Sequence, residues 1–157
     1  MHYIARMEPN DHLPFIDTHR VQISASPDAV YAAVWKVLRR SFTGRMAAIY
    51  GRLMKCQPPR AVLTAQPEVG ISAFRGFAVT NAAAPTLLHI AGSHRCAQYC
   101  IEIALTQVET GTVLAVTTRA AFPGVHGRVY RAFVIGSRGH VLAMRGLLRA
   151  VARQVSS

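Results

Sequence analysis

From Gly124 to Ser157 the chain repeats apolar residues at the spacing of an α-helix. On a helical wheel of about 100° per residue, the apolar and the basic residues fall in separate sectors. The apolar sector contains Val129, Tyr130, Phe133, His140, Val141, Met144, Leu147, Leu148, Val151 and Val155. The basic sector contains Arg128, Arg131, Arg138, Arg145, Arg149 and Arg153. The pattern predicts one long amphipathic helix that buries its apolar stripe and exposes its arginines.

Between Ala61 and Pro123 the apolar period changes to two, which is typical of strands. The predicted strands are AVLTAQ, FRGFAVTN, TLLHIAG, CAQYCIEIALTQVE and TVLAVTTRAAF. The last two predict a hairpin with Thr110-Gly111 as its loop, which places Glu102 opposite Arg119 on the outer face. The inner face of this hairpin then carries Tyr99, Ile101, Ile103 and Leu105.

The first third of the chain predicts a strand followed by two helices. Residues 1–18 contain Pro9, Asn10, Asp11 and Pro14 and predict an irregular lead-in, and HRVQISAS alternates as a strand does. Ser26 suits the N-cap of a helix and Pro27 its first turn. A second helix is expected over 43–55, because Pro58-Pro59 stops it soon afterwards. Residues 19–157 are therefore expected to form a single domain of the α+β class.

This element order, with VQISASPDAVYAAVWKVL near its start, resembles the START-like superfamily, which includes birch-pollen-allergen-like and polyketide cyclase-like proteins. The segments GSHRCAQY and AFPGVHGRVYRAFVIGSRGH resemble uncharacterised bacterial members. The resemblance runs from about Asp17 to Val155. It implies the helix-grip fold, in which a curved antiparallel sheet wraps a long C-terminal helix and two short helices follow the first strand. Its members include lipid carriers, hormone receptors and cyclases, so the fold does not select a function.

Length and composition favour a compact globule. The 157 residues are 51% apolar, enough for one domain with a real core. No apolar run approaches the roughly 18 residues that span a bilayer, and the N-terminus does not read as a secretory signal. We therefore expect a cytoplasmic protein without a transmembrane segment. The cysteines, Cys56, Cys96 and Cys100, are expected to be reduced, because no C-x-x-C occurs and Cys96 and Cys100 are too far apart along a strand to bridge.

The net charge of +11 could attract nucleic acid or an anionic membrane surface. Outside the last predicted helix, however, the basic residues are dispersed. The sequence contains no RNA-binding aromatic motif, zinc-finger spacing or convincing helix-turn-helix. No nucleic-acid partner is expected.

His140 is the most informative candidate for chemistry, because it lies at the centre of the apolar stripe of the last predicted helix. Gly136 and Gly139 precede it, and each weakens a helix by about 1 kcal/mol relative to alanine. They favour a kink or a close backbone contact. His140 is then a polar anchor or a general acid or base in a pocket. The alternative is a buried histidine that bonds a backbone carbonyl.

Other side chains could share that pocket. His94 and Arg95 lie at the turn into a long strand, where they could hold an anionic ligand group at a pocket mouth or simply end a solvated hairpin. The hydroxyls of Tyr99 and Tyr130 could bind a ligand oxygen, although packing is their commoner role. Together with apolar wall residues, the ligand-binding candidates are His140, Tyr130, Tyr99, Phe133, Met144, His94 and Arg95.

The sequence contains no G-x-S-x-G, H-E-x-x-H or other ligand spacing, so no metal and no cofactor are expected. The leading hypothesis is a binding protein for a small hydrophobic molecule, lipid or polyketide-like, in a cavity between the sheet and the C-terminal helix. One alternative is a cyclase or dehydratase that uses pocket histidine and tyrosine as acid and base. Another is an interaction module that uses the arginine-rich helix face. Ligand identity and oligomeric state stay open.

Overall fold

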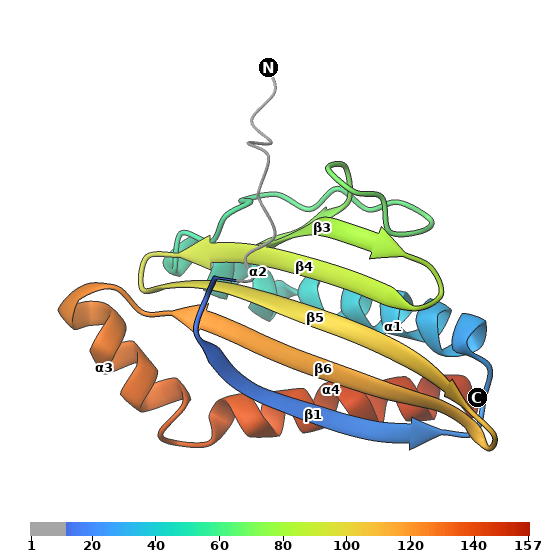
Figure 1. Ribbon diagram of the computed structural model, residues 1–157. Helices are drawn as coiled ribbons and strands as arrows, with labels where there is room; N and C mark the ends of the chain where they lie inside the picture. The colour runs from blue at the N-terminus through green and yellow to red at the C-terminus, as the bar shows by residue number, and fades with distance from the viewer. Residues whose placement is uncertain (1–11) are drawn as a thin grey trace.

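The computed structural model describes residues 12–157 as one antiparallel sheet with helices on one face (Figure 1). The six strands follow the order β1-β6-β5-β4-β3-β2. They are β1 (Phe15–Ile23), β2 (Ala73–Phe74), β3 (Phe77–Ala83), β4 (Leu87–His94), β5 (Ala97–Val108) and β6 (Gly111–Ala121). The helices are α1 (Pro27–Phe42), α2 (Arg45–Leu53), α3 (Gly124–Val134) and α4 (Gly139–Val155). This is an α+β helix-grip architecture, and the predicted fold class is confirmed.

Helix α1 supplies most of the core beneath the sheet. The Ser26 Oγ accepts from the backbone N–H of Ala29 at 3.3 Å and Pro27 opens the helix, as the sequence predicts. Its buried face consists of Val30, Tyr31, Ala33, Val34, Trp35, Val37 and Leu38. Helix α4 adds Leu148 and Val151 beside it. The two helices lie side by side behind the sheet in Figure 1, so α1 and α4 together cover the face of the sheet where the sequence analysis placed a ligand cavity.

The predicted single C-terminal helix is wrong, because the chain breaks between α3 and α4. Arg138 has a left-handed backbone with φ of 60°, and the hydroxyl of Ser137 accepts from the N–H of Gly139. Gly136 is crowded, since an added Cβ would lie 2.3 Å from the carbonyl oxygen of Ala132. Gly136 and Gly139, which have low helix propensity, therefore lie where one helix ends and another begins, and not at a kink within one helix. The predicted exposure of Arg131, Arg138, Arg145 and Arg149 is confirmed.

The β5–β6 hairpin has the predicted faces but a different register. Val108 pairs with Gly111 around the loop of Glu109 and Thr110, so Glu102 lies opposite Thr117 instead of Arg119. Gly111 belongs to the strand because it touches β1: an added Cβ would lie 2.1 Å from the carbonyl oxygen of Ile23. The glycine marks a close approach and not the turn itself. Along β6 buried residues alternate with partly exposed ones, which confirms the predicted two-face pattern.

Three of the predicted strands also differ from the structure. Strand β1 starts at Phe15, inside the predicted lead-in, while residues 1–11 lie outside the described residues. The segment 61–66 forms a single bridge, Val62 with Ala73, in place of a strand. Gly76, with φ of 89°, divides the predicted FRGFAVTN strand into β2 and β3. This glycine turn brings backbone over β4, which matters for the site below.

Candidate functional site

Aromatic rings form a continuous ladder from the core to one end of the sheet. The ladder starts at Trp35 of α1, which lies 5.1 Å from Phe74, and it passes through Phe42 to Phe77. From Phe77 it continues to Tyr99 at 4.9 Å, and from Tyr99 to His94 at 5.4 Å. Aromatic rings whose centroids lie 4.5–7 Å apart stabilise the fold by more than the burial of their surface alone would. The buried core therefore positions the polar rings at the outer end.

The outer end of the ladder is a cluster of four polar rings, Tyr50, His94, Tyr99 and Tyr130, here called the aromatic cluster. The His94 ring lies 4.8 Å from that of Tyr130, edge to face. The hydroxyls of Tyr50 and Tyr130 lie 2.5 Å apart and join α2 to α3. Tyr99 donates its hydroxyl hydrogen to the carbonyl of Gly76 at 2.9 Å. The sequence analysis named three members of the cluster and missed Tyr50.

The hydrogen bonds of the aromatic cluster leave donors available. The backbone N–H of Cys96 donates to Nδ1 of His94 at 3.1 Å, so a neutral His94 carries its proton on Nε2. Tyr50 and Tyr130 share one hydrogen bond, in which one hydroxyl donates and the other keeps its hydrogen. In the described part of the chain, neither that second hydrogen nor Nε2 has a protein acceptor. The cluster thus offers an N–H and an O–H to a further acceptor.

Partial desolvation favours the uncharged forms of the aromatic cluster. Desolvation lowers the pKa of His94 and so favours the neutral imidazole. Desolvation also raises the pKa of Tyr99, Tyr50 and Tyr130 above the ordinary value of a phenol. The neighbouring Cys56 thiol has a raised pKa for the same reason, partly offset by its hydrogen bond to Tyr99 and by Arg75. At neutral pH the site presents neutral hydrogen-bonding groups.

The lowered pKa of His94 gives an expected pH dependence of stability. The unfolded chain takes up a proton near the ordinary histidine pKa of about 6.5, whereas folded His94 resists protonation. His94 therefore does not reduce the free energy of unfolding above that pH, and it reduces this free energy progressively as the pH falls. Urea unfolding at pH 7.5 and 5.5 should show that His94→Gln reduces the loss of stability on acidification. The exposed His126→Gln is the control, and equal losses in all three proteins would contradict the assignment.

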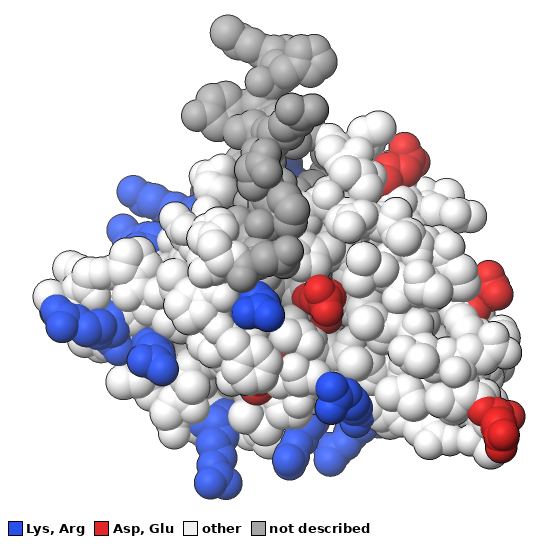
Figure 2. Space-filling view, viewed as in Figure 1, with Lys and Arg blue, Asp and Glu red and all other residues white. Residues whose placement is uncertain are grey.

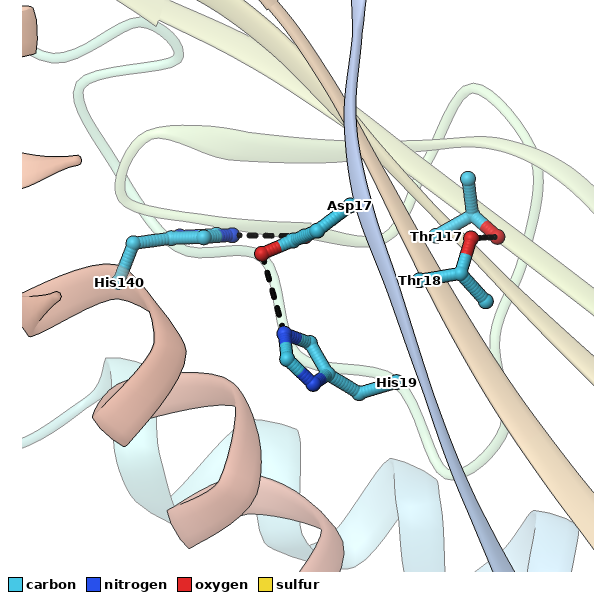
Figure 3. Close-up of polar contacts among 5 residues, drawn as sticks. All are labelled: Asp17, Thr18, His19, Thr117 and His140. Atoms are coloured by element: carbon cyan, nitrogen blue, oxygen red, sulfur yellow. Dashed lines mark hydrogen bonds and ion pairs between the residues drawn. The ribbon is translucent and has the colours of Figure 1, made fainter.

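His140 lies in a different place from the aromatic cluster. Its side chain is 13% exposed and reaches β1, where Nε2 lies 3.2 Å from an oxygen of Asp17 (Figure 3). The other Asp17 oxygen lies 3.0 Å from Nε2 of His19. The prediction that His140 is buried against the sheet is confirmed, but its partner is a carboxylate and not a backbone carbonyl. Its contact with Asp17 ties α4 to the edge strand β1.

Three other candidates are distributed elsewhere. Phe133 is 77% exposed on α3, so it does not wall an enclosed cavity. Met144 packs, partly buried, against the main core. Arg95 is exposed, and its backbone N–H donates to the carbonyl of Met54. The assignment of Phe133 to a pocket wall is wrong because α3 stands at the edge of the molecule, separated from α4 by the break (Figure 1).

In the described part of the chain, two of the hollows at the surface lie away from the aromatic cluster. The larger, about 640 Å³, lies between α1 and α4. Its lining is Lys36, Val37, Arg40, Ser41, Ala150, Arg153, Gln154 and Ser157. The other, about 420 Å³, lies at the β5–β6 hairpin end, beside Ser24–Ser26. The predicted cavity between sheet and C-terminal helix is not one of these two hollows, and Leu148 and Val151 of α4 belong to the same buried core cluster as Leu38 and Phe74.

Residues 12–157 contain no candidate metal site, disulfide or membrane-spanning helix. This part of the chain contains no group of three or more His, Cys, Asp or Glu arranged to hold a metal ion. None of Cys56, Cys96 and Cys100 is in a disulfide. Among the described helices, none has the length and apolar character needed to traverse a bilayer.

Comparisons with known proteins identify the fold. No protein-family model matches the chain, and no curated protein matches it. The crystal structure of protein CV1439 from Chromobacterium violaceum has a TM-score of 0.54 at 14% identity, over 90% of this chain and 96% of that chain. A protein of Rhodobacter sphaeroides also gives 0.54, at 17% identity, over 88% of this chain and 90% of that chain. The chain therefore has the helix-grip fold that its resemblance to START-like and polyketide cyclase-like proteins implied.

Proposed function

We propose that the protein binds a small apolar or aromatic molecule, lipid or polyketide-like, through an acceptor oxygen at the aromatic cluster. The observation that carries the proposal is the pair of available donors, Nε2–H of His94 and one hydroxyl of the Tyr50–Tyr130 pair. A ligand carbonyl or hydroxyl oxygen accepts such bonds, and a site built to donate them rejects analogues that lack the oxygen.

Aromatic surface around these donors suits a ring-containing ligand. Phe77 lies 4.9 Å from the ring of Tyr99, and Phe122 lies 6.3 Å from the ring of Tyr130. Flat apolar rings supply contact area at little cost in side-chain entropy. Small-molecule sites combine such apolar walls with a few placed polar groups. The neutral state of the cluster favours a neutral oxygen over a carboxylate.

Hydrogen bonding favours binding over catalysis at this site. A general base needs an available lone pair, and the lone pair of His94 accepts from the Cys96 amide. His140, the other candidate base, is held by Asp17. The cyclase or dehydratase alternative retains one supporting feature, since protonated phenols can polarise a substrate carbonyl. Release of water or formation of a new ring from a bound polyketide-like substrate would favour that alternative.

Ligand screening followed by variants tests the proposal. Fatty acids, flavonoids, sterols and polyketide-like aromatics are screened by thermal shift, and the purified protein is examined by native mass spectrometry. For a ligand found in this way, His94→Leu should weaken affinity about tenfold, the effect of one lost hydrogen bond. The double variant Tyr50→Phe with Tyr130→Phe should weaken it similarly, because either hydroxyl alone can still donate.

His140→Leu is the matched control, since His140 is bonded elsewhere. It should lower stability, because it leaves Asp17 with one partner fewer, but it should leave ligand affinity unchanged. Affinity lost in His140→Leu and kept in His94→Leu would contradict the proposed site.

The cytoplasmic location stays a prediction from the sequence.

A further inference from the structure

Helices α2 and α3 present large apolar side chains to solvent. These residues, here called the α2–α3 face, are Met46, Ile49 and Leu53 on α2 and Val125, Val129 and Phe133 on α3, with exposed fractions from 60% to 77%. A helix at a protein surface ordinarily turns such residues inward. A group of six on two joined helices marks an interaction surface.

The outward direction of these residues follows from how each helix is attached. The one buried residue of α2 is Gly51, which packs under the side chain of Arg75. The one buried residue of α3 is Gly127, where an added Cβ would lie 2.6 Å from the backbone of Phe122. Both helices place a glycine against the body of the protein, so their bulky side chains lie outside.

The two helices are held beside each other. The 2.5 Å hydrogen bond between Tyr50 and Tyr130 joins them, and the ring of His94 contacts both tyrosines. On the helical wheel Tyr50 borders the apolar sector of α2, and Tyr130 borders that of α3. The apolar residues of the two helices therefore lie on either side of one junction.

The surroundings of the α2–α3 face are basic. The exposed Arg45 and Arg52 lie on α2, and the exposed Arg128 and Arg131 lie on α3. No Asp or Glu occurs in 29–67 or in 110–157. In Figure 2 the end of the molecule where α3 lies shows basic and no acidic side chains.

We propose that the α2–α3 face docks on the surface of an anionic lipid bilayer. Apolar side chains with Lys or Arg beside them bind such surfaces, the former entering the headgroup–acyl boundary and the latter attracting anionic headgroups. Charge also argues against a second copy of this chain as the occupant, since a symmetric contact would bring the four arginines of one copy against those of the other. The proposal does not rest on ligand binding at the aromatic cluster.

Vesicle co-sedimentation of the full chain tests the proposal. Vesicles of phosphatidylcholine with phosphatidylglycerol should bind the protein, and vesicles of phosphatidylcholine alone should bind it far more weakly. The double variant Val129→Asp with Phe133→Asp should weaken binding to the anionic vesicles about tenfold or more, since it places charge where apolar contact is needed. Val69→Asp is the matched control, because Val69 is 53% exposed in the loop before β2, and it should bind as the wild type does.

Circular dichroism should show that these variants stay folded, because all three positions are exposed. Arg128→Gln with Arg131→Gln should reduce binding more than Arg145→Gln with Arg149→Gln on α4. Absence of binding to anionic vesicles overturns the proposal, as does an equal loss in Val69→Asp. Dimerisation that requires Val129 overturns it in favour of a second copy, and binding to an acidic protein without binding to vesicles overturns it in favour of that partner.

Discussion

Replacing Phe74 by alanine is expected to lower the free energy of unfolding by about 3–5 kcal/mol, the usual cost of truncating a buried phenylalanine. Phe74 is fully buried and lies 5.1 Å from Trp35 and 5.8 Å from Phe42, so the change removes a step of the aromatic ladder. The surrounding residues belong to two different elements, α1 and the sheet, so they cannot relax fully into the cavity that the change leaves. Urea unfolding followed by circular dichroism measures the effect.

Phe133→Ala is the matched control for this prediction. Phe133 is 77% exposed on α3, and surface changes usually stay within about 0.5 kcal/mol. A loss in Phe74→Ala no greater than in Phe133→Ala would contradict the ladder as the connection between core and site.

Gly92→Ala is expected to cost about 3 kcal/mol, near the upper end of the range for overpacking. An added Cβ at Gly92 would lie 1.8 Å from the carbonyl oxygen of Gly76 and 2.9 Å from that of Gln57. Both are backbone atoms, so the strand or the Gly76 turn must move. The same Gly76 oxygen accepts the hydroxyl of Tyr99, so the variant should also disturb the aromatic cluster.

Thermal unfolding compares this variant with Gly146→Ala. An added Cβ at Gly146 meets nothing within 4 Å, so alanine should stabilise α4 by up to about 1 kcal/mol. If both variants were equally stable, the close approach of Gly76 to Gly92 would be absent in solution. Ultraviolet absorbance of tyrosine would report separately whether Tyr99 changes its surroundings in Gly92→Ala.

The sequence predicted the elements that local periodicity and capping determine. The N-cap at Ser26 is a local feature, because the residues that make it are adjacent in the chain. The inner face of β5 and β6 is likewise readable, since alternation has a fixed period of two. The predicted hairpin register differs from the observed one by two residues. Gly111 lies close to Ile23 on another strand, and rules for hairpin loops do not take such a contact into account.

The candidate site was predictable only in part. His94, Tyr99 and Tyr130 were named, each for its place on its own segment. Tyr50 was missed, because its hydrogen bond to Tyr130 spans 80 positions of the chain. Its place on an amphipathic helix was visible, but the apolar periodicity alone did not distinguish a surface-facing apolar side from a core-facing one. Gly51 and Gly127 were the available signal, because each is the residue through which its helix packs against the body of the protein.

His140 illustrates the opposite case. The wheel placed it inward correctly, although the helix on which that wheel was drawn is two helices. Its partner, Asp17, lies on β1 in a segment that the sequence analysis treated as irregular. A carboxylate hydrogen bond across 123 positions cannot be read from either segment alone. The strongest single candidate of the sequence is thus a link between α4 and the edge strand.

The most direct test of the ligand proposal is to map the binding site by NMR. A ligand from the screen is titrated into the isotope-labelled protein while backbone and ring signals are followed. The account predicts that the largest shifts belong to Tyr50, His94, Tyr99 and Tyr130, and that they disappear for an analogue without the acceptor oxygen. Shifts concentrated instead at Ala150 and Gln154, in the hollow between α1 and α4, would contradict it.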